Sequence, residues 1–164
     1  MTDADISNAV LKTIRQIIRA IDLQSKQLVK KYGLTGPQLV VLKEIAEVKE
    51  ISIGQLSRDI CLSQATVTNI VDRLETKGAL RRIRSPEDRR KVMVQATEKT
   101  FTLLAGKPSL FQENFIHEFQ KLPLWEKTQL LSSLQRLAEM MNADKLKAEP
   151  VLVSGPLDET EPEL

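Results

Sequence analysis

Hydrophobic residues recur at intervals of three and four along most of this chain, a spacing that is typical of helices that bury one face. The first such stretch covers residues 4–31 and predicts one long helix, longer than a small domain needs for its own core. A break at residues 32–34 separates it from a second helix, which Thr35 is suited to cap and which is expected to end near Glu47.

The middle of the chain changes to shorter elements. Residues 51–53, Ile-Ser-Ile, have β-branched side chains at alternate positions and predict one strand of a small sheet. Residues 54–61 predict a two-turn helix, and a tight connection leads into a further helix over residues 63–77. Two short helices joined in this way, the second polar on its outer face, form a helix-turn-helix.

The helix predicted over residues 63–77 has two chemically distinct faces. Its apolar stripe consists of Val67, Ile70, Val71 and Leu74. Its opposite face carries hydrogen-bonding groups, namely Gln64, Thr68, Asn69, Asp72 and Arg73. Ser63 stands where an N-cap belongs, and Gly78 is free to take the positive φ that ends many helices.

A basic hairpin is predicted directly after this helix. Residues 80–84 and 92–96 flank the sequence SPED at residues 85–88, whose turn chemistry supports a hairpin. Residues 77–91 include seven basic and two acidic side chains, a net charge of +5. A solvated charged turn is the simplest interpretation of such a run, but its position after a helix-turn-helix favours nucleic-acid binding by a winged module.

The last third of the chain is again helical in pattern. Residues 97–122 show helical spacing with an interruption at residues 106–108, where a proline predicts a kink or a short break. A last helix is predicted over residues 125–142, with leucines spaced for packing of helix on helix. Residues 148–164 are rich in proline, glycine and acid and predict a flexible tail.

The composition is that of a soluble, single-domain protein. The chain has 164 residues, of which 41% are hydrophobic and 28% charged, and its few aromatics and glycines favour a mainly helical fold. No apolar run approaches the length needed to span a bilayer, so we expect a cytoplasmic protein without a membrane partner. The net charge of the whole chain is +2. Residues 149–164 contribute five acidic and no basic side chains, so the rest of the chain carries a net charge of +7.

Cysteine and histidine offer little chemistry. The single cysteine, Cys61, excludes an internal disulfide, and its neighbours Ile60 and Leu62 predict that it is buried. The single histidine, His117, leaves too few ligands for a zinc site. We therefore expect no metal and no other cofactor.

The order of these predicted elements resembles the MarR family of winged-helix transcriptional regulators over roughly residues 6–142. The resemblance is carried by GLTGPQLVVL at residues 33–42 and by LSQATVTNIVDRLETKGALRRIRSPEDRRKVMVQAT at residues 62–97. In the second segment the sequence DRR at residues 88–90 is similar to the wing of that family.

The resemblance implies a mainly α fold with N- and C-terminal dimerisation helices and a small β-hairpin wing. Residues 1–34 and 98–147 would form the dimerisation helices of a homodimer. Residues 35–97 would form the winged helix-turn-helix DNA-binding domain, and residues 148–164 the flexible acidic tail.

The resemblance also implies how double-stranded DNA would be bound, with the recognition helix in the major groove of a near-palindromic operator. Arg90 would enter the minor groove, Asp88 would hold the wing arginines, and Arg89 could exchange roles with Arg90. The expected DNA-binding residues are Ser63, Gln64, Thr66, Thr68, Asn69, Arg73, Arg84, Asp88, Arg89, Arg90 and Lys91. A guanidinium suits these roles, because its forked donors match phosphate and guanine edges and the narrow minor groove attracts positive charge.

Aromatic side chains suggest an effector site. Phenylalanines recur every four residues over 111–119, and packing in the core or a dimer is the simplest interpretation. The sequence LPLWEKTQLLSSLQRLAEMM at residues 122–141 is similar to the family members that regulate ectoine and other compatible-solute genes. That similarity implies cation–π binding of a solute such as glycine betaine, and a phenolic ligand is the other effector class. The expected effector-binding residues are Tyr32, Phe111, Phe115 and Trp125.

The sequence therefore predicts a DNA-binding transcriptional regulator without enzymatic activity, a homodimeric repressor modulated by a small effector. Two alternatives stay open, a helical protein-interaction adaptor that retains a winged helix and a redox-sensing regulator acting through Cys61. A nuclease subunit is disfavoured, because acids such as Asp72, Glu75 and Asp88 form no clustered metal site and are expected to orient basic side chains.

Overall fold

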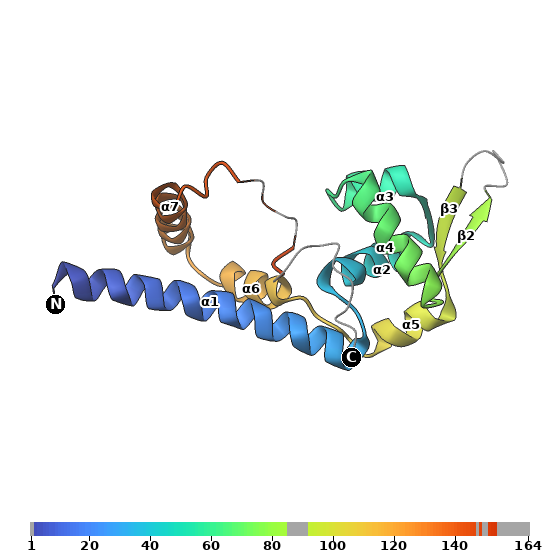
Figure 1. Ribbon diagram of the computed structural model, residues 1–164, viewed down its shortest axis with the longest axis horizontal. Coiled ribbons are helices and arrows are strands. Elements are labelled where there is room, and N and C mark those ends of the chain that lie inside the picture. The colour runs from blue at the N-terminus through green and yellow to red at the C-terminus, as the bar shows by residue number, and fades with distance from the viewer. Residues whose placement is uncertain (1, 85–91, 147, 149–150, 154–164) are drawn as a thin grey trace.

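The computed structural model describes residues 2–84, 92–146, 148 and 151–153 of the chain. These residues form a winged-helix body and a set of helices that lie outside it (Figure 1). The described part is mainly helical and contains a three-stranded antiparallel sheet, which confirms the predicted fold class.

The body runs from α2 to α5. Its elements are α2 (Gly36–Val48), β1 (Glu50–Ser52), α3 (Ile53–Asp59), α4 (Gln64–Thr76), β2 (Leu80–Arg84), β3 (Val92–Ala96) and α5 (Glu98–Ala105). The strands lie in the order β1-β3-β2, and β3 pairs antiparallel with both neighbours. The helix-turn-helix and both hairpin strands are thus confirmed, whereas the predicted turn at residues 85–88 lies outside the described residues.

The core of the body lies where α4 packs against α2 and α3. The predicted apolar stripe of α4 is buried in full: Val67, Ile70, Val71 and Leu74. These side chains join Leu39, Leu42, Ile45, Leu56, Leu80 and Val94 in one buried cluster. Because burial of each such side chain contributes about 1.5–3 kcal/mol, α4 is anchored by one face and presents the other outward.

Ser52 moves the expected boundary between the first strand and the third helix. Its Oγ accepts a hydrogen bond from the backbone N–H of Gln55 at 3.2 Å and so caps α3. The helix consequently begins at Ile53, and the prediction of a strand over residues 51–53 is wrong at that residue. The cap satisfies a backbone N–H that would otherwise lack a partner in the first turn, and this local bond outweighs the β propensity of isoleucine.

Three helices lie outside the body: α1 (Asp3–Tyr32), α6 (Phe111–Gln120) and α7 (Leu124–Met140). α6 lies beside α1, and α7 stands away from both (Figure 1). Their exposed large apolar side chains include Ile6, Val10, Leu11, Ile17, Ile18, Phe115, Ile116, Leu130, Leu131 and Leu134. The break predicted at Pro108 is confirmed, because α5 ends at Ala105 and α6 begins at Phe111. None of the helices in the described ranges is long and apolar enough to cross a membrane.

Part of the predicted tail is not free. Residues 151–153 return to the body, and Val151 is only 5% exposed within the same buried cluster (Figure 1). The backbone N–H of Leu152 donates to Oε1 of Gln112 at the start of α6, at 3.1 Å. Within the predicted tail Val151 is therefore buried and Val153 half-buried, a placement that the composition of the segment did not indicate. Residues 149–150 and 154–164 lie outside the described ranges.

Candidate nucleic-acid interface

The N-terminus of α4 is fixed by the side chain predicted to cap it. Oγ of Ser63 accepts a hydrogen bond from the backbone N–H of Thr66 at 3.1 Å and lies 2.7 Å from the hydroxyl of the same residue. At the other end, Gly78 takes φ +72° and its N–H donates to the carbonyl of Glu75 at 2.8 Å. The cap and the stop therefore lie where the sequence placed them, and both define the length of the helix.

The outer face of α4 is polar and accessible. Ser63, Gln64 and Asn69 are exposed, while Thr66, Thr68 and Arg73 are half-buried. The hydroxyl of Thr68 donates to the carbonyl of Gln64 at 2.8 Å, which leaves its oxygen able to accept. The structure therefore brings these six predicted residues together on one helix, with donors and acceptors that suit the edges of bases.

The basic hairpin is joined to α4 by a cluster around Arg82. The guanidinium binds Oδ1 of Asp72 and Oε2 of Glu75, and Oε1 of Glu75 accepts the backbone N–H of Arg82 at 3.1 Å. The hydrogen bond to Asp72 raises the pKa of Arg82 above its usual value. These contacts tie the end of the recognition helix to the first wing strand.

The cluster divides the basic side chains of β2 by role. Two carboxylates compensate the charge of Arg82, so we expect its guanidinium to hold the hairpin on α4 rather than to bind a phosphate. Arg81 is exposed and donates through Nε and a terminal nitrogen to the neutral Oε1 of Gln95, at 2.8 and 2.5 Å. Arg84 is exposed at the end of the strand. Arg81 therefore keeps its charge at the surface and joins Arg84 as a candidate contact.

Arg81 and the partners of Arg82 were not assigned from the sequence. Alternation of side chains along a strand puts Arg81 on one face and Arg82 and Arg84 on the other. The sequence offered no reason to prefer one of these three arginines over the others as a DNA contact. The acids Asp72 and Glu75 were expected to orient basic side chains, and the structure identifies Arg82 as the side chain they bind. The predicted DNA-binding residues Asp88, Arg89, Arg90 and Lys91 lie outside the described residues.

Cys61 does not have the environment that its neighbours suggested. The residue is exposed and takes φ +56° in the turn between α3 and α4, with Sγ 3.7 Å from the carbonyl of Arg58. The expectation of a buried cysteine is wrong, because the left-handed turn rotates Cys61 outward while Ile60 enters the core. The turn geometry, rather than the hydrophobicity of adjacent residues, decides its exposure.

The four residues expected to bind an effector, Tyr32, Phe111, Phe115 and Trp125, do not line one common cavity. The hydroxyl of Tyr32 donates to the carbonyl of Gly106 at 2.7 Å, and Phe115 stacks on Phe119 with ring centroids 5.3 Å apart. Phe111 is half-buried at the start of α6, and Trp125 is 66% exposed on α7. A single chain does not bring these side chains into one enclosed aromatic site.

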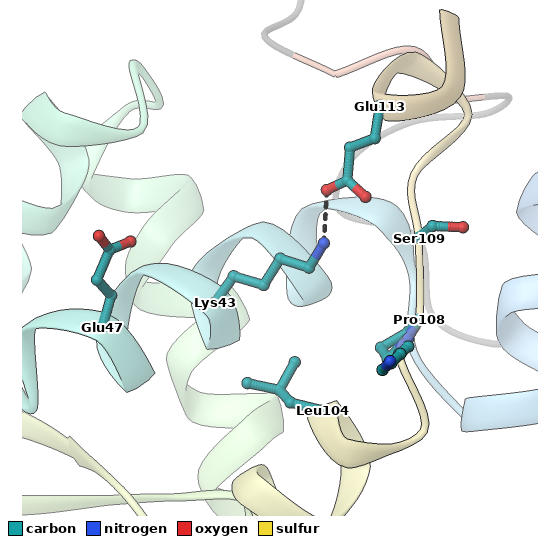
Figure 2. Close-up of a pocket in the computed structure, with 7 residues that line it drawn as sticks. Lys43, Glu47, Leu104, Pro108, Ser109 and Glu113 are labelled. Carbon is teal, nitrogen blue, oxygen red and sulfur yellow. Dashed lines mark hydrogen bonds and ion pairs between the residues drawn. The ribbon is translucent and has the colours of Figure 1, made fainter. Parts of the chain in front are cut away.

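A cavity of about 540 Å³ lies instead between the body and the start of α6 (Figure 2). It is lined by Lys43, Glu47, Leu104, Lys107, Pro108, Ser109 and Glu113. Nζ of Lys43 donates to Oε1 of Glu113 at 2.5 Å across the cavity (Figure 2). The lining is charged on both signs, so the cavity suits a small polar ligand better than an aromatic one. In the described residues no group of three or more His, Cys, Asp or Glu is placed to hold a metal ion.

The chain is similar in sequence and fold to known transcriptional regulators. The model of the MarR family matches residues 34–92. The chain is 31% identical over 83 residues to an uncharacterized HTH-type transcriptional regulator, YsmB of Bacillus subtilis, a match that covers 51% of this chain and 57% of that protein. It is 28% identical over 131 residues to the HTH-type transcriptional regulator SarZ of Staphylococcus haemolyticus, covering 74% and 86% of the two chains.

The fold is also seen in a solved structure. The transcriptional regulator BldR from Sulfolobus solfataricus aligns with a TM-score of 0.54 and 28% identity, over 85% of this chain and 99% of that one. This alignment extends beyond the helix-turn-helix to the outer helices, whereas the match to the Bacillus protein spans little more than half of its length.

Proposed function

Because this chain belongs to the MarR family, we propose that it is a homodimeric repressor of the cytoplasm that binds specific operator sequences in double-stranded DNA. One observation carries the proposal. A helix anchored by its apolar stripe presents Ser63, Gln64 and Asn69 outward, and the cluster at Arg82 holds the wing strands at a set angle to that helix. A helix of this kind fits the major groove, and a basic wing beside it fits the adjacent backbone or minor groove.

The outer helices support assembly with a second copy. Leu130, Leu131 and Leu134 form an exposed apolar run on α7, and Leu134 is 55% exposed in the single chain. Apolar surface of this extent costs free energy in water and marks an interface in soluble proteins. A two-fold dimer built on these helices would place two recognition helices about 34 Å apart, one turn of DNA, and would require a near-palindromic operator.

The cavity beside α6 supports control by a small effector. It lies between the body and the outer helices, so a ligand bound there would contact both parts. Its carboxylates and lysines favour a zwitterion such as glycine betaine over a phenolic acid, whose carboxylate could pair with a lysine but which would leave the charge of Glu47 unmatched. Calorimetry with each compound tests this, and heat with the phenolic acid alone would reverse the assignment.

The DNA-binding role is tested by selecting bound fragments from genomic DNA and titrating the selected sequence at fixed salt. In this titration Arg90→Ala is expected to lose about 1–3 kcal/mol of binding free energy, because a guanidinium in the minor groove is removed. Lys26→Ala is the matched control, since that lysine is exposed on α1 and pairs with Asp22 of the same helix at 2.9 Å. Full affinity of the Arg90 variant would remove the minor-groove assignment.

Salt dependence separates this proposal from a protein-interaction adaptor. A regulator that neutralises phosphates loses affinity linearly on a logarithmic salt scale, because bound counterions are released. Binding that is weak, independent of sequence and insensitive to salt would instead favour the adaptor.

A further inference from the structure

The segment Val151–Val153 is seated against the body in an ordered way. Val151 is buried and Val153 half-buried, while the side chain of Leu152 between them is exposed. The backbone N–H of Leu152 donates to the side-chain oxygen of Gln112 at 3.1 Å. Two valines thus enter the protein on either side of one backbone hydrogen bond.

We call the site at Gly36 and Leu110, which receives this segment, the seat. The seat lies where the two connections between the body and the outer helices meet. Gly36 begins α2 directly after the first connection, and Leu110 ends the second connection at the start of α6. Both residues are buried. A Cβ added at Gly36 would lie 2.6 Å from Cγ1 of Val153 and 3.5 Å from Cδ2 of Leu110. Only glycine admits the valine this closely, so the first turn of α2 is shaped for the C-terminal segment.

A second contact joins the same two connections. The hydroxyl of Tyr32, the last residue of α1, donates to the carbonyl of Gly106, the C-cap residue of α5. Lys107 follows with φ +51°, a conformation that ends the helix and turns the chain toward α6. Rotation of the body against α1 and α6 must take place at these connections, because packed helices on either side are stiff.

We propose that residues 151–153 act as an intramolecular ligand of this seat, and that their occupancy fixes the angle between the winged-helix body and the outer helices. Fixing this angle sets the separation of two recognition helices in a dimer, so release of the segment changes operator affinity. The effect on affinity rests on the proposed function, whereas the effect on the connections does not.

If the segment occupies this seat, two chemically different substitutions that expel it should have the same effect. Gly36→Ala expels Val153 by steric contact and keeps a residue suited to a helix, so a loss of helix stability is not expected. Val153→Asp expels the segment by placing a charge in an apolar seat. Leu152→Ser is the matched control, because that side chain is exposed and the backbone hydrogen bond to Gln112 is unaffected.

Amide hydrogen exchange of the full chain measures directly whether the segment occupies the seat. Gly36→Ala and Val153→Asp are each expected to accelerate exchange of the amides of residues 106, 107, 109 and 110, and Leu152→Ser is expected to leave them unchanged. If Gly36→Ala fails to fold, Val153→Asp and a chain ending at Ala148 carry the same test. Exchange in these variants that matches the wild type would overturn the proposal.

Titration of the selected operator measures how release of the segment changes DNA affinity. Both substitutions should change affinity in the same direction by about fivefold or more, the usual size of coupling between sites. The double variant should equal either single variant, because both remove the same contact. Altered exchange with unchanged affinity would show that the segment is a structural contact only and would overturn the regulatory part, whereas a wild-type protein that selects no DNA would refute the proposed function alone.

The acidic residues beyond the seat offer a rival cause that can be separated. Replacing Asp158, Glu159, Glu161 and Glu163 by their amides removes a charge that could screen the basic face but leaves the seated valines in place. Our proposal expects this variant to keep wild-type exchange at residues 106–110. If it alone changed operator affinity, while Gly36→Ala did not, charge rather than seating would be the cause.

Discussion

The substitution Arg82→Met tests whether the wing is positioned by an ion-pair cluster. Methionine keeps the apolar length of the side chain and removes the guanidinium that binds Asp72 and Glu75. We expect lower stability and weaker operator binding, although Arg82 is not expected to contact DNA. The reason is that the first wing strand would lose its attachment to the recognition helix.

The magnitude follows from the exposure of the partners. The Asp72 side chain is 53% exposed, so its bond to Arg82 contributes about 0.2–1 kcal/mol, as for a surface ion pair. Glu75 is 37% exposed, so its bond to the guanidinium contributes about 1 kcal/mol after discounting for solvent. Its bond from the backbone N–H of residue 82 is kept in the methionine variant and does not add to the loss. Together the expected loss in free energy of unfolding is about 1–2 kcal/mol.

Denaturant unfolding and salt-dependent DNA titration provide the measurements. Arg81→Met is the matched control, because Arg81 is exposed and, among the described residues, bonds to the neutral side chain of Gln95. We expect the control to change stability by no more than about 0.5 kcal/mol. If Arg81 contacts a phosphate, its loss lowers the slope of log affinity against log salt by about 1, whereas loss of Arg82 leaves the slope unchanged.

Two outcomes would refute this reasoning. An Arg82→Met protein with wild-type stability and affinity would show that the cluster does not position the wing. A reduced salt slope for that variant would show that Arg82 binds a phosphate despite its two carboxylate partners. A double-mutant cycle with Glu75→Gln isolates the pair from other effects, and a coupling energy near zero would contradict the geometry.

Three further predictions concern the helix ends and the assembly. Ser63→Ala should lower the free energy of unfolding by about 0.5–2 kcal/mol in denaturant unfolding, because the N–H of Thr66 loses its cap. Leu134→Asp on α7 should convert the assembly to a monomer by sedimentation, and a dimer of unchanged affinity would exclude that face as the interface. Hydrogen bonds from Thr2 lower the pKa of Asp5, so the capped first turn of α1 is stabilised above the usual carboxyl pKa of about 4 and should fray as the pH falls below it. Amide exchange at the start of α1 measures this, and Asp5→Asn should abolish the pH dependence.

Local chemistry explains why much of the fold was predictable. The cap at Ser63 and the left-handed Gly78 depend on atoms within a few residues of one another, so their sequence pattern is sufficient. The apolar residues of α4 recur with the period of a helix and so lie on one face, and that face is buried whichever elements pack against it. The error at Ile53 has the same origin, because a hydroxyl one residue earlier decided between strand and helix.

The candidate site needed contacts between distant residues. The pairing of Arg82 with Asp72 and Glu75 depends on the angle at which the hairpin meets α4, and three arginines in five positions carry no sign of that angle. The outward turn of Cys61 likewise depends on how two short helices are joined. Hydrophobicity of neighbouring residues cannot report such geometry.

The sequence by itself determined which stretches form helices and strands, and which face of the recognition helix is buried, because these properties arise from short-range hydrogen bonds and periodic burial. Only the tertiary structure decided which charges of the hairpin are compensated and where the segment at Val151 lies. A stretch rich in proline, glycine and acid reads as a tail on composition. Val153 nevertheless packs against Gly36, more than 100 positions away, and that match of shapes exists only after the chain has folded.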